Sequence, residues 1–160
     1  MFLDERESGL IDEFRIWMES AVSGLLRTSD FNRQDGDDGR LLLTRWPAGR
    51  RYWYEIAIRP FLCQVRVGVM TDDVFRSEDL GRLIADSGYT LQEFVVQGFG
   101  SVGLEWADPA VEHYCEEGLR YYYSTPMEFG LIDQLGDWGF RDRMLKVLAG
   151  YGHAFFGCGE

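Results

Sequence analysis

Apolar and polar residues alternate most regularly from Tyr52 to Met70, in the stretch YWYEIAIRPFLCQVRVGVM. An alternation with a period of two puts successive side chains on opposite faces of a β-strand. The first half gives two faces, one with Tyr52, Tyr54, Ile56 and Ile58, the other with Trp53, Glu55, Ala57 and Arg59. After Pro60 the alternation resumes, with Cys63, Val65, Val67 and Val69 on one side. Because aromatic and β-branched residues favour strands, the stretch predicts two strands joined by a short turn.

The segments before this pair predict another strand and a helix. Residues 40–47 read as a strand that Pro47 ends, so the three strands on short connections form an antiparallel meander with one buried face. Apolar residues at steps of three and four predict a helix over residues 8–27, with Ser8 as its N-cap. Its apolar stripe contains Leu10, Phe14, Trp17, Ala21 and Leu25, widened by Ile11, Met18 and Val22.

Helical signals return after the meander. Ser77 is the expected N-cap of one segment, and Thr90 with Glu93 has the spacing of a capping box ahead of a second. The two segments form either one bent helix or a helix pair. Residues 101–106 and 119–126 then read as short strands, the second ended by Pro126. The residues between them, 108–118, read as a polar connection or a short helix.

The last third of the chain predicts a helix with a break near Trp138, where Gly136 and Gly139 disfavour helical structure. A glycine-rich aromatic tail is expected over residues 150–160. The predicted helical face contains Leu131, Leu135, Trp138, Leu145 and Leu148, with Ile132, Phe140 and Met144 beside it. The order of elements is helix, three strands, helix, two strands, helix. We therefore predict one α+β domain over residues 1–160, with an antiparallel sheet flanked by helices.

The composition and charge of the chain disfavour some classes of binding partner. The chain has 160 residues, 46% of them apolar, and a net charge of −11, which disfavours binding to nucleic acid or to an anionic membrane because like charges repel. The N-terminus lacks the basic start and apolar core of an export signal, and no apolar run approaches the roughly 18 residues of a membrane span, so we expect a cytoplasmic protein. The region 40–66 is the exception in charge, with six arginines and one acid, Glu55.

Two glycine-rich stretches resemble ligand-binding motifs without having their context. Residues 28–39, TSDFNRQDGDDG, are acidic, but no EF-hand register fits, because starting at Asp30 puts Asp35 where glycine is required. We expect a flexible polar loop there. Residues 98–103, GFGSVG, fit the spacing G-x-G-x-x-G but follow a helix instead of a strand. They predict a helix exit and a turn.

The residues that most often carry chemistry form no recognisable site. His113 and His153 are far apart in sequence, and no metal-ligand spacing joins them to Cys63, Cys115 or Cys158. Cys63 fits a small core residue, and three cysteines without motif spacing do not predict a disulfide framework. We therefore predict no catalytic residue, no cofactor and no metal. A small enzyme stays an alternative, in which a histidine, a cysteine and a carboxylate meet in a pocket.

The order of elements, in a small acidic chain, resembles the type III secretion chaperone-like fold, an α-β-β-β-α-β-β-α unit. The resemblance is one of topology and composition over nearly the whole chain. It implies a homodimer that binds an extended segment of a client protein on apolar grooves and strand edges. It implies no catalytic residues.

Two functional hypotheses follow. The first is a non-enzymatic chaperone or adaptor for a protein or peptide, since one face of the hairpin can be buried while the other stays available. Its predicted partner-binding residues are Trp53, Glu55, Arg59, Arg66 and Tyr122. The second is an acidic inhibitor or immunity protein that masks a basic toxin or nuclease. It would use the carboxylates of residues 28–39 and 112–117 for fast, salt-sensitive association.

Overall fold

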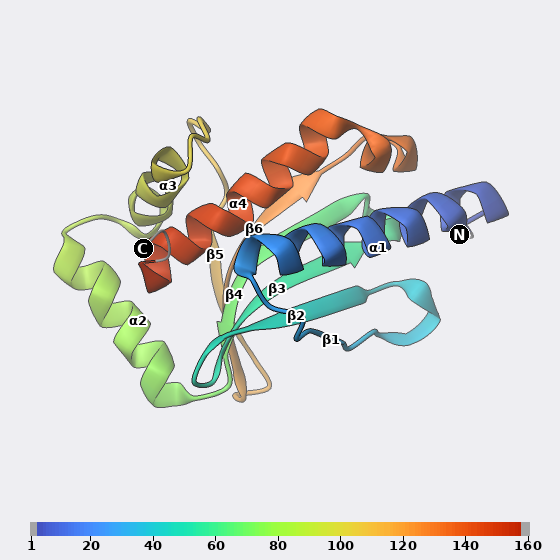
Figure 1. Cartoon of the computed structure of the whole chain (residues 1–160). Helices are drawn as coiled ribbons and strands as arrows, with labels where there is room; N and C mark the ends of the chain where they lie inside the picture. The colour runs from blue at the N-terminus through green and yellow to red at the C-terminus, as the bar shows by residue number, and fades with distance from the viewer. Residues whose placement is uncertain (1–2, 158–160) are drawn as a thin grey trace.

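The computed structural model describes residues 3–157 and shows an antiparallel sheet with helices packed against one face (Figure 1). This confirms the α+β class. The helices are α1 (Glu5–Leu26), α2 (Val74–Ser87), α3 (Leu91–Ser101) and α4 (Trp138–Phe156). The strands are β1 (Asn32–Arg33), β2 (Leu42–Gly49), β3 (Tyr52–Arg59), β4 (Gln64–Thr71), β5 (Glu112–Glu116) and β6 (Arg120–Glu128). Short 3-10 turns are η1 (Asp37–Gly39), η2 (Pro60–Leu62) and η3 (Ile132–Gly136).

The six strands of the described chain lie in the order β1-β2-β3-β4-β6-β5, and every neighbouring pair is antiparallel. Strands β2, β3 and β4 form the predicted meander. The register aligns one residue from each strand across the sheet, as in the row Thr44, Ile56, Val67 and Thr125. Residues two apart along a strand share a face, so this row belongs to the same face as Tyr54 and Ile58.

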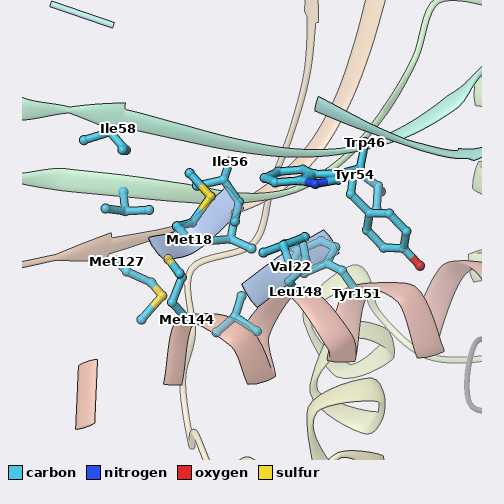
Figure 2. Close-up of a cluster of buried hydrophobic side chains, with 14 of the residues drawn as sticks. Met18, Val22, Trp46, Tyr54, Ile56, Ile58, Met127, Met144, Leu148 and Tyr151 are labelled. Carbon is cyan, nitrogen blue, oxygen red and sulfur yellow. The ribbon is translucent and has the colours of Figure 1, made fainter. Parts of the chain in front are cut away.

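That face carries the core, as the alternation predicted. Ile56, Ile58, Val65 and Val67 are fully buried, and α1 and α4 cover them (Figure 1). Figure 2 shows Met18 of α1 and Met144 of α4 filling the space beside Ile56, with Trp46 and Tyr151 nearby. Cys63 does not belong to this row, because it follows η2 in a left-handed turn (φ 49°) before β4 begins.

The helix ends differ from the prediction at two of three N-termini. Asp4, with Glu7 as its capping-box partner, caps α1 in place of Ser8, and Asp73 caps α2 in place of Ser77. The predicted box of Thr90 and Glu93 does begin α3. In each corrected case an aspartate lies a few residues upstream of the expected serine, so the helix begins earlier. Helices α2 and α3 are a pair, separated at Gly88.

The predicted apolar stripes of the terminal helices are buried or partly buried, with three exceptions. In α1, Leu25 is 47% exposed, whereas Ile11, Met18 and Val22 are buried with Phe14. The charged side chains Arg15 and Glu19 are also buried, and they occupy the side of α1 that faces β2. In the last third, Leu131 and Trp138 are each 68% exposed. The core residues there are Ile132, Leu135, Met144 and Leu148 of the predicted face, joined by Val147, Tyr151 and Phe155.

Both prolines expected to end strands lie inside them. Pro47 is within β2 and Pro126 within β6. Proline has no backbone N–H group to donate. A sheet tolerates this loss where no neighbouring strand would accept that hydrogen bond. The edge strand β1 pairs only with Thr44 and Arg45, and β5 reaches no further along β6 than Ser124, so neither edge strand extends to a proline.

The strand predicted over residues 101–106 is wrong. Helix α3 runs through Ser101, and the short strand before β6 is instead β5, within the segment read as a polar connection or helix. Gly98 lies inside α3, where a Cβ atom would overlap the carbonyl oxygen of Gly150 and lie 2.8 Å from Cβ of Ala154. The glycine pattern therefore serves close packing of α3 on α4. Gly103 alone forms the predicted turn, with a φ of 79°.

The expected tail over residues 150–160 is helical as far as Phe156. Asp137 is the N-cap of α4, and the helix continues from Trp138 to Phe156. Tyr151 is fully buried and Phe155 nearly so, which makes these residues part of the core. The break predicted near Trp138 is present, because η3 ends just before α4. Cys158 lies outside the described residues.

Residues 28–39 form a loop that also contains β1 and η1, and ion pairs attach it to α1. The Arg15 guanidinium donates to both carboxylate oxygens of Asp35, at 2.8 and 2.6 Å. Arg33 donates to Glu19, whose carboxylate also accepts from the Thr44 hydroxyl at 2.9 Å. The Arg15 guanidinium holds the pKa of Asp35 below its ordinary value. This polar cluster fixes the loop against the edge of the sheet.

Candidate functional site: the open face of the sheet

The sheet face opposite the helices is the candidate site, and we call it the open face. In the part of the chain that the structure describes, no helix packs against it; α1 and α4 both lie on the other side (Figure 1). Its residues come from alternate positions of five strands. They are Leu43, Arg45, Pro47, Trp53, Glu55, Ala57, Arg59, Gln64, Arg66, Gly68, Met70, Glu112, Tyr114, Glu116, Arg120, Tyr122, Ser124, Pro126 and Glu128.

All five predicted partner-binding residues lie on the open face. The register aligns Trp53 with Met70, Tyr122 and Tyr114 in one row, while Glu55 lies in the row of Arg45, Gly68 and Ser124. Arg66 and Arg59 follow in the next two rows. The alternation of β3 and β4 therefore identified a real cluster. Whether this cluster binds a partner stays a prediction.

A buried ionic network lies at the centre of the open face. Arg45 donates from Nε to Glu55 at 2.8 Å, from Nη2 to the Tyr122 hydroxyl at 3.2 Å, and from Nη1 to the Gln34 side-chain oxygen at 2.8 Å. Arg45, Glu55 and Tyr122 are only 8%, 9% and 4% exposed. Burial raises the pKa of Glu55, opposed by the Arg45 charge, and burial also raises the pKa of Tyr122.

This burial corrects the roles of two predicted contact residues. Glu55 and Tyr122 are enclosed by their own neighbours: Tyr114 stacks on Tyr122 with ring centroids 4.8 Å apart, and Arg45 neutralises Glu55. They therefore shape the floor of the face. Trp53, Arg59 and Arg66 are partly exposed and form its accessible part.

Arginines surround this floor, and two of them are paired. Arg66 forms an ion pair with Glu112, donates to the Ser124 hydroxyl at 3.3 Å, and lies 5.8 Å from the centre of the Tyr114 ring. Arg120 pairs with Glu116 at 3.3 Å. Most of the charge on the open face is thus balanced locally, in a chain that is strongly acidic elsewhere.

Two small cavities open between these side chains. One, of about 130 Å³, is bounded by the Arg45–Glu55 pair, Tyr114 and Tyr122, and by three further arginines, Arg59, Arg66 and Arg120. The other, of about 270 Å³, lies beside Trp53, Met70 and Asp72. Gly68 adds no side chain to the centre, because a Cβ atom there would overlap the backbone of β6. The hollow offers hydrogen-bond donors, aromatic surface and one buried carboxylate.

Sequence reasoning missed Arg45, Tyr114 and Arg120. The register of β2 against β3 places Arg45 opposite Glu55. The predicted meander implied that these strands pair, but it did not fix their register. Tyr114 belongs to β5, which was not predicted as a strand. Arg120 lies at the start of β6, one residue after Leu119, and its side of the strand becomes significant only once β6 is placed next to β4.

His113, His153, Cys63 and Cys115 do not line the two open-face cavities. His113 stacks on Tyr123 with centroids 4.0 Å apart, and its Nδ1 is 2.9 Å from the Tyr122 carbonyl oxygen. Cys63 is partly buried, and Cys115 is exposed on β5. Among residues 3–157 no group of three or more histidine, cysteine or acidic side chains is arranged to hold a metal ion.

Comparison with protein-family models, curated proteins and solved structures finds no match to this chain. No helix between residues 3 and 157 has both the length and the apolar character needed to cross a lipid bilayer.

Proposed function

We propose that the protein is a non-enzymatic adaptor or chaperone that binds a segment of another protein on the open face of its sheet. One observation carries this proposal. A sheet face that no helix of residues 3–157 covers gathers a partly exposed tryptophan, several arginines and a hollow polar floor in one place.

The chemistry of the face suits a protein partner. Tryptophan, tyrosine and arginine dominate the binding energy of protein interfaces, because they bury large areas and make directional hydrogen bonds. The floor is already organised by the Arg45–Glu55 pair and the Tyr114–Tyr122 stack. A partner therefore has few side chains to order when it binds, which lowers the entropic cost of association.

The acidic-inhibitor alternative has less support. It relied on the carboxylates of residues 28–39 and 112–117 being available to a basic partner. Asp35 is ion-paired with Arg15, Glu112 with Arg66 and Glu116 with Arg120. Those carboxylates are occupied within the chain, so the free acidic groups are fewer than the sequence suggests.

The test compares Trp53→Ala on the open face with Phe75→Ser on α2, where Phe75 is 71% exposed and lines neither open-face cavity. Proteins captured from the source cells by the wild type are identified, purified and titrated against both variants. We expect Trp53→Ala to weaken binding about tenfold or more, as for a central interface tryptophan. Phe75→Ser is expected to leave the affinity unchanged.

Equal affinities of the wild type and Trp53→Ala, with both chains folded by circular dichroism, would contradict the proposal. Light scattering on the purified wild type tests the predicted homodimer separately, because it needs no partner.

A further inference from the structure

A second pocket adjoins the open face where β3 ends. The 3-10 turn η2 follows β3 directly, and its side chains lie beside the residues that lead into β2. Together they enclose about 470 Å³, the largest of the pockets described here, lined by Arg40, Leu41, Arg59, Phe61 and Leu62. Leu62 is 65% exposed although it is one of the apolar lining residues. The exposed Leu62 side chain therefore adds apolar surface beside the two arginines of the pocket.

The two arginines of this pocket are unlike the other arginines of the open face. Arg45, Arg66 and Arg120 each pair with a glutamate. The guanidinium groups of Arg40 and Arg59 make no hydrogen bond and no ion pair with any residue between 3 and 157. Two unpaired cations beside one apolar pocket attract an anion, and a planar guanidinium binds a carboxylate through two parallel hydrogen bonds.

The pocket is continuous with the site described above. Leu41 and Arg59 line both the apolar pocket and the small cavity around Glu55. A chain lying across the open face past Trp53 and Arg66 can therefore reach η2 without leaving the surface. This path runs along β3, since Trp53 lies near the start of that strand and Arg59 is its last residue.

The geometry points to a binding site for an acidic and apolar segment of the partner protein, in which a large apolar side chain enters the Leu41–Phe61–Leu62 pocket and an adjacent carboxylate pairs with Arg40 and Arg59. This inference rests on the proposed function and specifies the partner's chemistry. The volume suits a side chain of the size of leucine or phenylalanine together with part of its neighbour. Because the rest of the chain is acidic, an acidic segment is repelled elsewhere and is held in one register at this end of the face.

The experiment uses a fluorescein-labelled peptide with a central leucine-phenylalanine pair followed by two glutamates. Two matched peptides replace the glutamates by glutamines or the apolar pair by serines. Binding to the intact protein is measured by fluorescence anisotropy at low and at physiological salt. We expect the acidic-apolar peptide to bind about tenfold more tightly than either matched peptide, because one loses its charge-assisted hydrogen bonds and the other its apolar contact.

Three variants locate the contact. Arg59→Gln and Leu62→Ser are expected to weaken binding of the acidic-apolar peptide by about fivefold to tenfold. Arg50→Gln is the control, because Arg50 lies in the turn before β3, at the opposite end of that strand. Equal affinity of Arg59→Gln and Arg50→Gln, or no preference for the acidic peptide, overturns the inference. Decanoate that displaces the peptide from the wild type, while no peptide distinguishes the variants, assigns the pocket to a fatty acid and also overturns it.

The partner-binding test keeps the two proposals separable. If Trp53→Ala abolishes binding of the captured protein while Arg59→Gln and Leu62→Ser do not change it, the open face binds a partner and the acidic-apolar site is wrong. If Trp53→Ala has no effect, the proposed function itself fails.

Discussion

The two faces of one sheet bury their side chains by different means. The covered face buries hydrocarbon such as Ile56 and Val67 beneath two helices, as in the core of any layered domain. The open face buries Arg45, Glu55 and Tyr122 almost as deeply with no second layer, by stacking and pairing neighbouring side chains. Leu43, Ala57 and Met70 are also buried there, outside the main core. In this molecule, side chains of low exposure therefore belong either to the packed core or to a preorganised surface.

The strongest test of this difference removes a similar apolar volume from each face. Ile56→Ala leaves a cavity between the sheet and the helices, so we expect a loss of about 2–5 kcal/mol in the free energy of unfolding. Leu43 has no helix of residues 3–157 packed over it that could hold a cavity open. For Leu43→Ala we therefore expect a loss of about 1–2 kcal/mol in the free energy of unfolding. Urea denaturation of both variants measures the two losses. Equal losses would mean that the open face is packed like a core.

A second test concerns the helices that cover the sheet. Gly98→Ala forces a methyl group into the backbone of α4, so we expect a loss of about 1–3 kcal/mol. Gly100→Ala is the matched control in the same helix, because nothing lies within 4 Å of the added Cβ atom. Since alanine favours helix, it is expected to gain up to about 0.5–1 kcal/mol. Thermal unfolding compares the two, and a harmless Gly98→Ala would show that the α3–α4 contact is loose.

The smallest expected effect is a difference in pH dependence. Burial raises the pKa of Glu55 on the open face, so its contribution to stability is fully present below its ordinary value of 4.5 and is lost as the pH rises through the raised pKa. Arg15 lowers the pKa of Asp35 on the covered side. The contribution of Asp35 is present above its ordinary value of 3.8 and is lost as the pH falls through the lowered pKa.

The variants Glu55→Gln and Asp35→Asn separate the two signs in urea denaturation between pH 3 and pH 7. Relative to the wild type, Glu55→Gln is expected to become more stable as the pH rises through this range, and Asp35→Asn less stable. Parallel pH profiles for Glu55→Gln and the wild type would show that Arg45 fully compensates the buried carboxylate.

The sequence predicted best where one local signal decided the structure. The alternation of β3 and β4 identified both faces, and Thr90 with Glu93 located the start of α3. It predicted least where partners distant in the chain decide. β5 has polar residues on both sides and is a strand only because β6 lies beside it. Gly98 resembled a turn signal because the contact with Gly150, fifty-two residues away, is not visible in sequence.

The candidate site follows the same rule. Alternation related Trp53, Glu55, Arg59 and Arg66 within the hairpin, but only the pairing of β4 with β6 brings Tyr122 to the same face. Alternation also could not show that Glu55 and Tyr122 are enclosed. Their burial comes from Arg45 and Tyr114 on neighbouring strands. That Arg40 and Arg59 have no partner among the described residues likewise depends on where the carboxylates lie in the folded chain.

The short edge strand β5 has a consequence for self-association. If two copies joined their sheets symmetrically about Tyr114, antiparallel pairing would set Glu112 of each copy opposite Glu116 of the other. Like charges in directly opposed positions destabilise strand pairing. Glu117 and Gly118, with positive φ angles of 56° and 67°, then form the turn that leads into β6 and ends this edge. A five-residue acidic edge of this kind protects the chain against sheet-to-sheet aggregation, the hazard that accompanies every unpaired strand.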